Sequence, residues 1–266
     1  MTRWLVSGLV PQRSAVLLLG ELHSGRAWLT EQLALSVASG SRFLDVFEVQ
    51  RQPVILIDED SGTASFKRRL YRLARGLKVD LARIPLQCYS RCNFLLWDAE
   101  RRTWLRDLIR REKGTPLVIV DSLRRIMAWQ GPGGGDVMTG LGEFCHELRD
   151  AGATLLIVHQ TGARESVGLE DWDVAYQAPG FVVLVECFDM ALSIYRVPTV
   201  RTEFVLKPLE RRVKLKVRRP FSIALEEDEE ETWARLAVTD QLPELGGEVA
   251  TRVLPEVVKQ AVEPER

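Results

Sequence analysis

Short runs of core-forming residues, separated by segments with helical spacing, constrain the fold of this chain most strongly. Five runs, most of them rich in Val, Ile and Leu, occupy residues 15–19, 54–58, 117–121, 154–159 and 181–186. Continuous apolar runs of this length are typical of strands buried on both faces of a parallel sheet. Between them, apolar residues recur at helical spacing around residues 29–37, 70–77, 104–108 and 141–148. The repeated alternation predicts an α/β fold with a doubly wound, mostly parallel sheet.

The pattern changes after residue 186. Short, partly alternating stretches at 192–197, 203–206, 213–217 and 221–225 predict antiparallel strands that extend the sheet or form a small β lobe. Residues 226–231 are all acidic and predict a solvated turn. We therefore expect a core over residues 1–190, a β extension of the same domain over 191–240, and a flexible tail over 241–266.

Composition places the chain among ordinary globular proteins. Hydrophobic residues make up 46% and charged residues 27%, which excludes disordered, collagenous and disulfide-scaffold classes. No apolar run is long enough to span a bilayer, and no secretory leader follows Met1, so we expect a cytoplasmic protein without a membrane partner. The four cysteines lack zinc-ligand spacing, which predicts structural cysteines and no structural metal.

The connection between the first strand and the first helix carries the most chemical information. Gly20 and Gly25 are separated by four residues, which is the frame of the phosphate-binding P-loop, G-x-x-x-x-G-K-[ST]. In that loop the backbone N–H groups hold phosphates, the Lys reaches the β and γ phosphates, and the hydroxyl ligates Mg²⁺. Here Arg26 stands at the Lys position and Ala27, which has no oxygen, stands at the Ser/Thr position. The glycines also fit a plain strand-to-helix turn. The candidate binding residues are Gly20, Ser24, Gly25, Arg26 and Ala27.

Several motifs in order carry a family resemblance. They are Trp4–Pro11, the altered loop, Ala38–Gly40, Val54–Asp60 followed by Arg68–Leu70, Leu117–Leu123 and Leu156–Gly162. This order resembles the RecA-like AAA ATPases similar to plasmid replicative helicases of the RepA type, relatives of the DnaB and KaiC-type ATPases. The resemblance covers residues 4–186 and implies a RecA-like P-loop core with ATP and Mg²⁺ as possible cofactors.

The resemblance also implies roles for four residues. Asp121, at a strand end, takes the Walker B position that supports Mg²⁺ if nucleotide binds, and Glu59 takes the position of the carboxylate that activates the attacking water. His159 stands where relatives place a sensor of the γ phosphate, and Arg164 is a candidate arginine finger. From the residues alone, Asp121 fits a loop cap equally well, Glu59 fits a helix start, and His159 fits a structural role.

The chain departs from the family pattern at Arg26 and Ala27, the positions that bind triphosphate and Mg²⁺ in the family. Phosphoryl transfer depends almost wholly on positioned charge around the γ phosphate. The sequence therefore predicts a weak or inactive ATPase that serves as a DNA-associated or assembly module in replication or recombination. An active ATPase or helicase of the RepA type is the alternative, and a P-loop nucleotide kinase is a third, less favoured one.

The net charge of −1 does not favour nucleic-acid binding, so any such binding must depend on local clusters of basic residues. A predicted helix carries Lys67, Arg68, Arg69, Arg72 and Arg75, and the β extension carries Lys207, Arg211, Arg212, Lys214, Lys216, Arg218 and Arg219. Such clusters can track phosphates, although they also fit a solvated surface. With the resemblance included, the expected partners are single-stranded DNA and either further copies of the chain or a partner ATPase.

Overall fold

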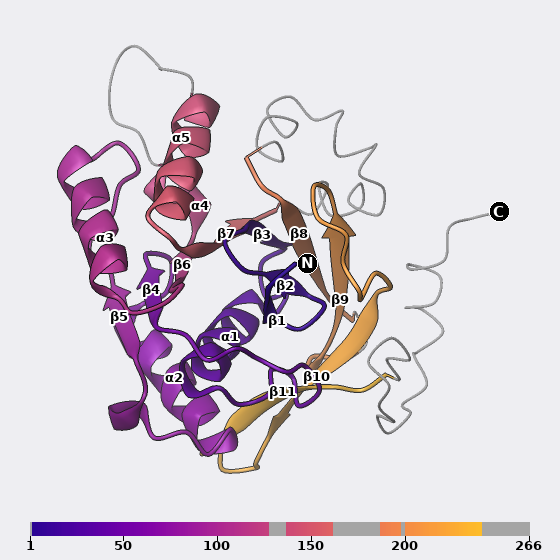
Figure 1. Cartoon of the computed structure of the whole chain (residues 1–266). Helices are drawn as coiled ribbons and strands as arrows, with labels where there is room; N and C mark the ends of the chain where they lie inside the picture. The colour runs from indigo at the N-terminus through magenta and orange to yellow at the C-terminus, as the bar shows by residue number, and fades with distance from the viewer. Residues whose placement is uncertain (1, 128–136, 162–186, 198–199, 241–266) are drawn as a thin grey trace.

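The computed structural model describes residues 2–127, 137–161, 187–197 and 200–240. Its helices and strands follow one another along the chain (Figure 1), with these bounds: β1 Trp4–Val6, β2 Val10–Pro11, β3 Ala15–Gly20, α1 Arg26–Ser39, β4 Val54–Asp58, α2 Thr63–Gly76, η1 Leu81–Arg83, β5 Leu86–Ser90, α3 Ala99–Arg111, β6 Leu117–Asp121, α4 Leu123–Ile126, α5 Val137–Asp150, β7 Thr154–Gln160, β8 Met190–Arg196, β9 Glu203–Glu210, β10 Phe221–Glu227 and β11 Ala234–Val238.

One nine-stranded sheet forms the centre, in the order β11-β10-β9-β8-β3-β7-β6-β4-β5. The strands from β8 to β5 in this order are parallel, whereas β9, β10 and β11 pair antiparallel with their neighbours. The predicted α/β class with a mostly parallel sheet and C-terminal antiparallel strands is therefore confirmed. The carboxyl ends of β3, β4, β6 and β7 share one edge, where open α/β sheets bind ligands.

Alternate residues of the central strands pack into two separate hydrophobic cores. In β3, Val16 and Leu18 point into the core that α1 and α2 cover, and Leu17 and Leu19 point into the core that α3 and α5 cover. This alternation follows from the period of two along a strand. Because both faces are covered, β3 and β6 are fully buried, which explains their uninterrupted apolar sequence.

The C-terminal strands continue the same sheet, because β8 pairs with β3 from Val16↔Met190 onward. Two sequence expectations here are corrected. Residues 213–217 form no strand: Lys216 N and Val217 N donate to the carbonyl of Gly8, which ties the segment to the β1–β2 hairpin instead of the sheet. Residues 226–231 are only partly a turn, since Glu226 and Glu227 still belong to β10.

Besides the short hairpin strands β1 and β2, two strands of the central sheet were not predicted from the sequence, and two predicted segments lie outside the described residues. β5 is an edge strand of only partly buried residues, so it has no apolar run. β11 is short and begins three residues after the acidic run ends. The predicted strand at 181–186 and the tail at 241–266 are not among the described residues. Every described helix is too short to cross a membrane.

The pairing of β8 beside β3 leads to a prediction about domain division. We expect limited proteolysis to release no stable fragment that ends near residue 190, because such a fragment loses β8 and with it one neighbour of β3. The amide of Gln32 on α1 also exchanges hydrogen bonds of 2.6 Å with the backbone of Leu236 on β11. Time-resolved digestion followed by mass spectrometry identifies the fragments that are released. A protease-resistant 1–190 fragment with native circular dichroism would contradict it.

Candidate functional site

The loop between β3 and α1 has the backbone of a tight strand-to-helix connection. A Cβ atom at Gly20 would lie 2.5 Å from Oγ of Ser24 and 2.9 Å from the carbonyl oxygen of Ile194. Gly25 has φ +86°, and the ring of Phe204 lies 2.8 Å from where its Cβ would be. Both positions therefore require glycine, Gly25 for its left-handed conformation as well as for space. The carbonyl of Gly20 accepts a hydrogen bond of 3.0 Å from Thr161 N, which fixes the loop to the end of β7.

The N-terminus of α1 is open to an anion. Gly25 is its N-cap, no side chain caps it, and its first turn contains no acidic residue. The unpaired N–H groups and the positive end of the helix dipole therefore face the loop without an internal partner. Oγ of Ser24, a residue only 2% exposed, likewise has no hydrogen-bond partner among the described residues.

Arg26 is buried at the first position of α1, with 8% of its surface exposed. Its Nη2 donates to Oε1 of Gln160 at 3.3 Å, while Nε and Nη1 lack a hydrogen-bond partner in the described part of the chain. Burial lowers the pKa of the guanidinium, and the charges of Asp121 and Asp60 oppose this shift. A buried cation with two unsatisfied donors is costly unless an anion pairs with it.

Two carboxylates stand opposite each other at the ends of neighbouring strands. Asp58 on β4 pairs in register with Asp121 on β6, and both are buried. Oδ1 of Asp58 accepts hydrogen bonds from the backbone of Asp60 and Ser61, at 3.0 and 2.8 Å. Burial, followed by the charge of Asp58, raises the pKa of Asp121 to about 7, and Arg26 opposes the shift. The predicted Walker B residue thus interacts electrostatically with the predicted loop cation.

Glu59 follows β4, as the sequence order requires, but its carboxylate is held by the segment after β5. Oε1 of Glu59 accepts a hydrogen bond of 2.8 Å from Phe94 N and another of 3.1 Å from Sγ of Cys92. The backbone N of Glu59 donates to the carbonyl of Asp121 at 2.5 Å. Glu59 is buried in this arrangement, with 7% of the residue exposed. Oε1 of Glu59 is therefore engaged with the segment after β5, and a role as the base would fall to Oε2 or require Oε1 to leave Phe94.

The end of β7 brings a polar pair to the same sheet edge. His159 and Gln160 are in register with Leu19 and Gly20 of β3, and both are partly buried. Gln160 accepts a hydrogen bond from Arg26. Arg164, the predicted arginine finger, lies outside the described residues.

Sequence reasoning missed a buried ion pair between α1 and α2. Glu31 of α1 is 2% exposed, and Oε1 accepts from Nε and Nη2 of Arg69 at 2.9 and 2.6 Å. Nη2 of Arg69 also donates to Oγ of Ser61 at 2.8 Å. Burial raises the pKa of Glu31 to about 8, with Arg69 opposing the shift. A carboxylate one turn after the loop, within an otherwise buried helix, is the signal that could have indicated this pair.

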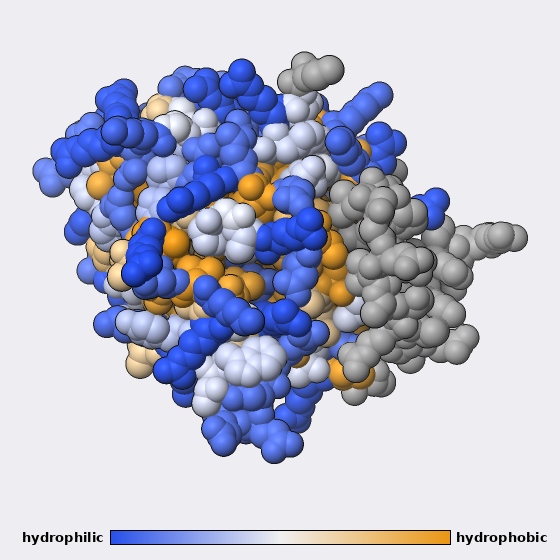
Figure 2. Space-filling model, turned by 60° about the horizontal axis from the view of Figure 1, so that its bottom comes forward, coloured by the Kyte–Doolittle hydropathy of each residue, from blue (hydrophilic) through white to orange (hydrophobic). Residues whose placement is uncertain are grey.

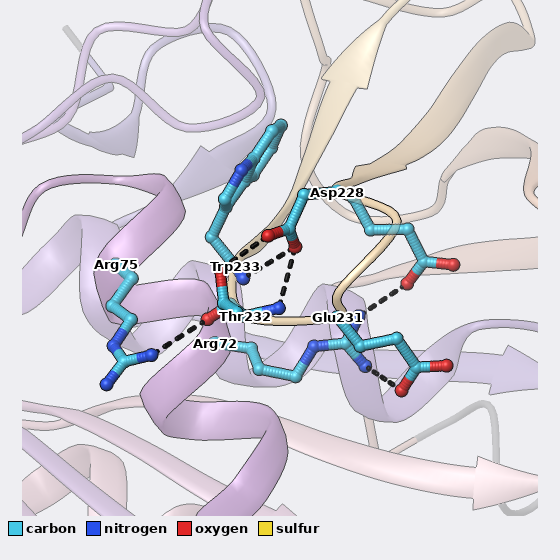
Figure 3. Close-up of polar contacts among 7 residues, drawn as sticks. Arg72, Arg75, Asp228, Glu231, Thr232 and Trp233 are labelled. Carbon is cyan, nitrogen blue, oxygen red and sulfur yellow. Dashed lines mark hydrogen bonds and ion pairs between the residues drawn. The ribbon is translucent and has the colours of Figure 1, made fainter.

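The basic helix α2 divides into an internal and an external set. Besides Arg69, Arg72 faces inward: its Nη2 binds Glu227 at 2.6 Å, its Nη1 binds Glu231 at 3.4 Å, and its guanidinium stacks 5.3 Å from the Trp28 ring centroid. Figure 3 shows Arg72 reaching the acidic β10–β11 turn. Lys67 and Arg68 are exposed on the outer side.

The same division holds in the β extension and on the surrounding surface. Lys214 and Lys216 are exposed, whereas Arg218, also exposed, forms an ion pair of 2.9 Å with Glu210. Figure 2 brings the bottom of Figure 1 forward, the side on which α2 and the β10–β11 turn lie. Hydrophilic side chains dominate this face and surround a smaller apolar area. Part of the predicted basic surface is therefore available to a partner, and part stabilises the fold.

The residues around the loop do not fit Mg²⁺ in the way that the P-loop pattern requires. Ala27 offers no oxygen, and the charge of Arg26 acts on the Asp121 carboxylate. No group of three or more His, Cys, Asp or Glu side chains suited to a metal ion occurs among the described residues. Mg²⁺ demands near-octahedral oxygen coordination, and the site presents a guanidinium in that vicinity instead.

A family model described as an AAA domain matches residues 1–166, which is more than half of the chain. The chain belongs to the AAA domain family. The fold of this AAA domain resembles the ATPase domain of G40P, with a TM-score of 0.58, 12% identity, and coverage of 83% of this chain and 84% of that chain. It also resembles a DnaB-like replicative helicase, described with its interactions with primase, with a TM-score of 0.59 and 12% identity.

The two solved structures differ in how much of their own chain the match covers. The match to the DnaB-like helicase spans 84% of this AAA domain protein but 59% of the helicase chain. At 12% identity both likenesses establish the fold, which is that of RecA-like helicase ATPase domains. No curated protein matches the sequence.

Proposed function

We propose that this AAA domain protein is a RecA-like module that binds nucleotide phosphates, hydrolyses ATP weakly or not at all, and acts with DNA in replication or recombination. The observation that carries the proposal is the buried Arg26 guanidinium, with Nε and Nη1 unpaired, at the open N-terminus of α1. A phosphate group supplies oxygens to both the guanidinium fork and the backbone N–H groups.

Two features of the site favour slow hydrolysis. Ala27 removes the hydroxyl that ligates Mg²⁺ in active P-loops. The Glu59 carboxylate, which would activate the water, accepts hydrogen bonds from Phe94 N and Cys92. Loss of positioned charge around the γ phosphate costs orders of magnitude in rate. These features favour the weak ATPase over the active helicase of the RepA type, and nothing at the site favours a nucleotide kinase.

Nucleotide binding tests the proposal directly. We expect wild-type protein to bind a fluorescent ATP analogue and ATP to displace it, with turnover near the buffer background. Arg26→Gln should weaken binding by about tenfold or more, since it removes the charge-assisted hydrogen bonds. Arg124→Gln, which alters an exposed arginine of α4, is the matched control. Absence of binding by the folded wild type would refute the proposal, and rapid turnover would favour the active ATPase.

We also propose that the exposed basic residues contact single-stranded DNA, alone or in an oligomer with further copies or a partner ATPase. The double substitution Lys67→Glu with Arg68→Glu should reduce the magnitude of the slope of log affinity against log salt by about 1.4, because each contact to a phosphate of a single strand contributes about 0.7 to the slope. Fluorescence anisotropy with a labelled oligonucleotide at several salt concentrations measures the slope.

The control for this prediction carries the same charge change elsewhere. Arg110→Glu with Arg111→Glu alters two exposed residues at the end of α3 and should leave the slope unchanged. Arg69 and Arg72 are unsuitable for this test, because their reversal breaks ion pairs inside the fold. Equal losses from both pairs of substitutions would contradict a phosphate-tracking role for α2.

A further inference from the structure

We propose that this site binds nucleotide phosphates without Mg²⁺, with the Arg26 guanidinium serving as the built-in countercation beside Asp121. The inference rests on the proposed function and specifies its ligand as the metal-free polyphosphate. It follows because the residues at the site do not fit Mg²⁺, the metal that the fold family implies.

The position of the guanidinium is the first step. Arg26 begins α1, its Nη2 contacts Gln160 at the end of β7, and its charge interacts with Asp121 at the end of β6 and with Asp60 after β4. The cation therefore lies between the phosphate loop and the carboxylate that would support a metal. Its burial fixes it there, since only 8% of the residue is exposed.

The unsatisfied donors are the second step. Nε and Nη1 of Arg26 and Oγ of Ser24 are buried without a hydrogen-bond partner among the described residues. Guanidinium donors in a planar fork match two oxygens of one phosphate group. A polyphosphate can therefore satisfy the loop N–H groups and the fork together, and the guanidinium can neutralise charge that a metal would otherwise neutralise.

The third step concerns the competing metal. A divalent cation bound at Asp121 would be repelled by the buried Arg26 cation, whose charge already acts on Asp121, and such repulsion is stronger in a buried site than in water. Oδ1 of Asp58, in the neighbouring register position, already accepts two backbone hydrogen bonds. With Ala27 the site lacks the hydroxyl ligand as well. Mg²⁺ thus gains few ligands here and meets repulsion.

The test compares nucleotide affinity with and without the metal. Dissociation constants for ATP, ADP and inorganic tripolyphosphate are measured by titration calorimetry on wild-type protein, in excess Mg²⁺ and in EDTA. We expect each dissociation constant in EDTA to be smaller than the constant in Mg²⁺, or equal to it within about twofold. Weakening by about tenfold or more in EDTA would overturn the inference, whereas absence of binding under both conditions would overturn the proposed function itself.

Two further arms sharpen the result. Measurable tripolyphosphate binding identifies the phosphates as the recognised group, and binding of ATP without any tripolyphosphate binding would contradict recognition through Arg26. Arg26→Lys with Ala27→Ser should make the affinity for ATP depend on Mg²⁺ by about tenfold or more. Equal affinity of this variant in Mg²⁺ and EDTA would argue against Arg26 as the countercation, with circular dichroism and thermal melting confirming that it folds.

Discussion

Mg²⁺-dependent ATP hydrolysis is expected to rise by at least about tenfold over wild type when Arg26→Lys and Ala27→Ser are combined. The glycine frame, β3 and the open end of α1 already present the backbone N–H groups for phosphates. Asp121 already lies at the end of β6. The double substitution supplies the missing ammonium and hydroxyl and removes the guanidinium from the metal's vicinity. Phosphate release, followed at several Mg²⁺ concentrations, measures the gain.

The single substitutions and Glu59 provide the controls. Either substitution alone should stay near the wild-type rate, because each restores one of the two missing groups. Adding Glu59→Gln to the double variant should abolish the gain if the Glu59 carboxylate can exchange Phe94 N for the attacking water. A folded double variant that neither binds nor hydrolyses ATP would indicate that Asp58, Glu59 and Asp121 are structural caps.

A second large effect is expected on the pH dependence of stability. Burial raises the pKa of Asp121 from 3.8 to about 7, so between these values the native state holds a proton that the unfolded chain releases. The contribution of Asp121 to the free energy of unfolding is therefore fully present below about pH 4 and is lost as the pH rises to about 7. Asp121→Asn mimics the protonated form and should be more stable above pH 7, by up to about 4 kcal/mol.

Urea unfolding at half-unit pH steps measures this effect. The difference between the curves of wild type and Asp121→Asn should grow from pH 4 to pH 7 and then level off. Asp107→Asn, at a half-exposed position of α3, should give a curve parallel to that of wild type. A parallel curve for Asp121→Asn would show that Asp121 is not the group responsible.

The sequence patterns predicted the sheet where burial on both faces imposes an uninterrupted apolar run. β3, β4, β6 and β7 are such strands, and the glycine frame after β3 was correctly placed. β5 was missed because an edge strand such as Leu86–Ser90 needs no apolar run. The residues 213–217 alternate like a strand, yet their backbone bonds to Gly8, a contact between distant segments that periodicity does not encode.

Side-chain partners were the least predictable part of the site. Arg69 and Arg72 look equivalent to Arg68 in sequence, but α2 turns the first two toward Glu31 and Glu227. Their roles depend on which face of α2 packs against α1 and the β10–β11 turn. Likewise, the position of Glu59 could be predicted from its strand, whereas the direction of its carboxylate depends on Phe94, 35 residues further along the chain.

The position of β3 in the sheet has a consequence for co-translational folding. β3 is complete at Gly20, but its two neighbours, β7 and β8, begin only at Thr154 and Met190. At about 5–20 residues per second, the nascent β3 waits on the order of 10 s for its first partner. During that interval Val16 and Leu18 can pack against residues of β1, β2, α1 and α2, and Leu17 against residues of β4 and β6. The two backbone edges of β3 stay unpaired throughout, because the strands that pair with them are made much later.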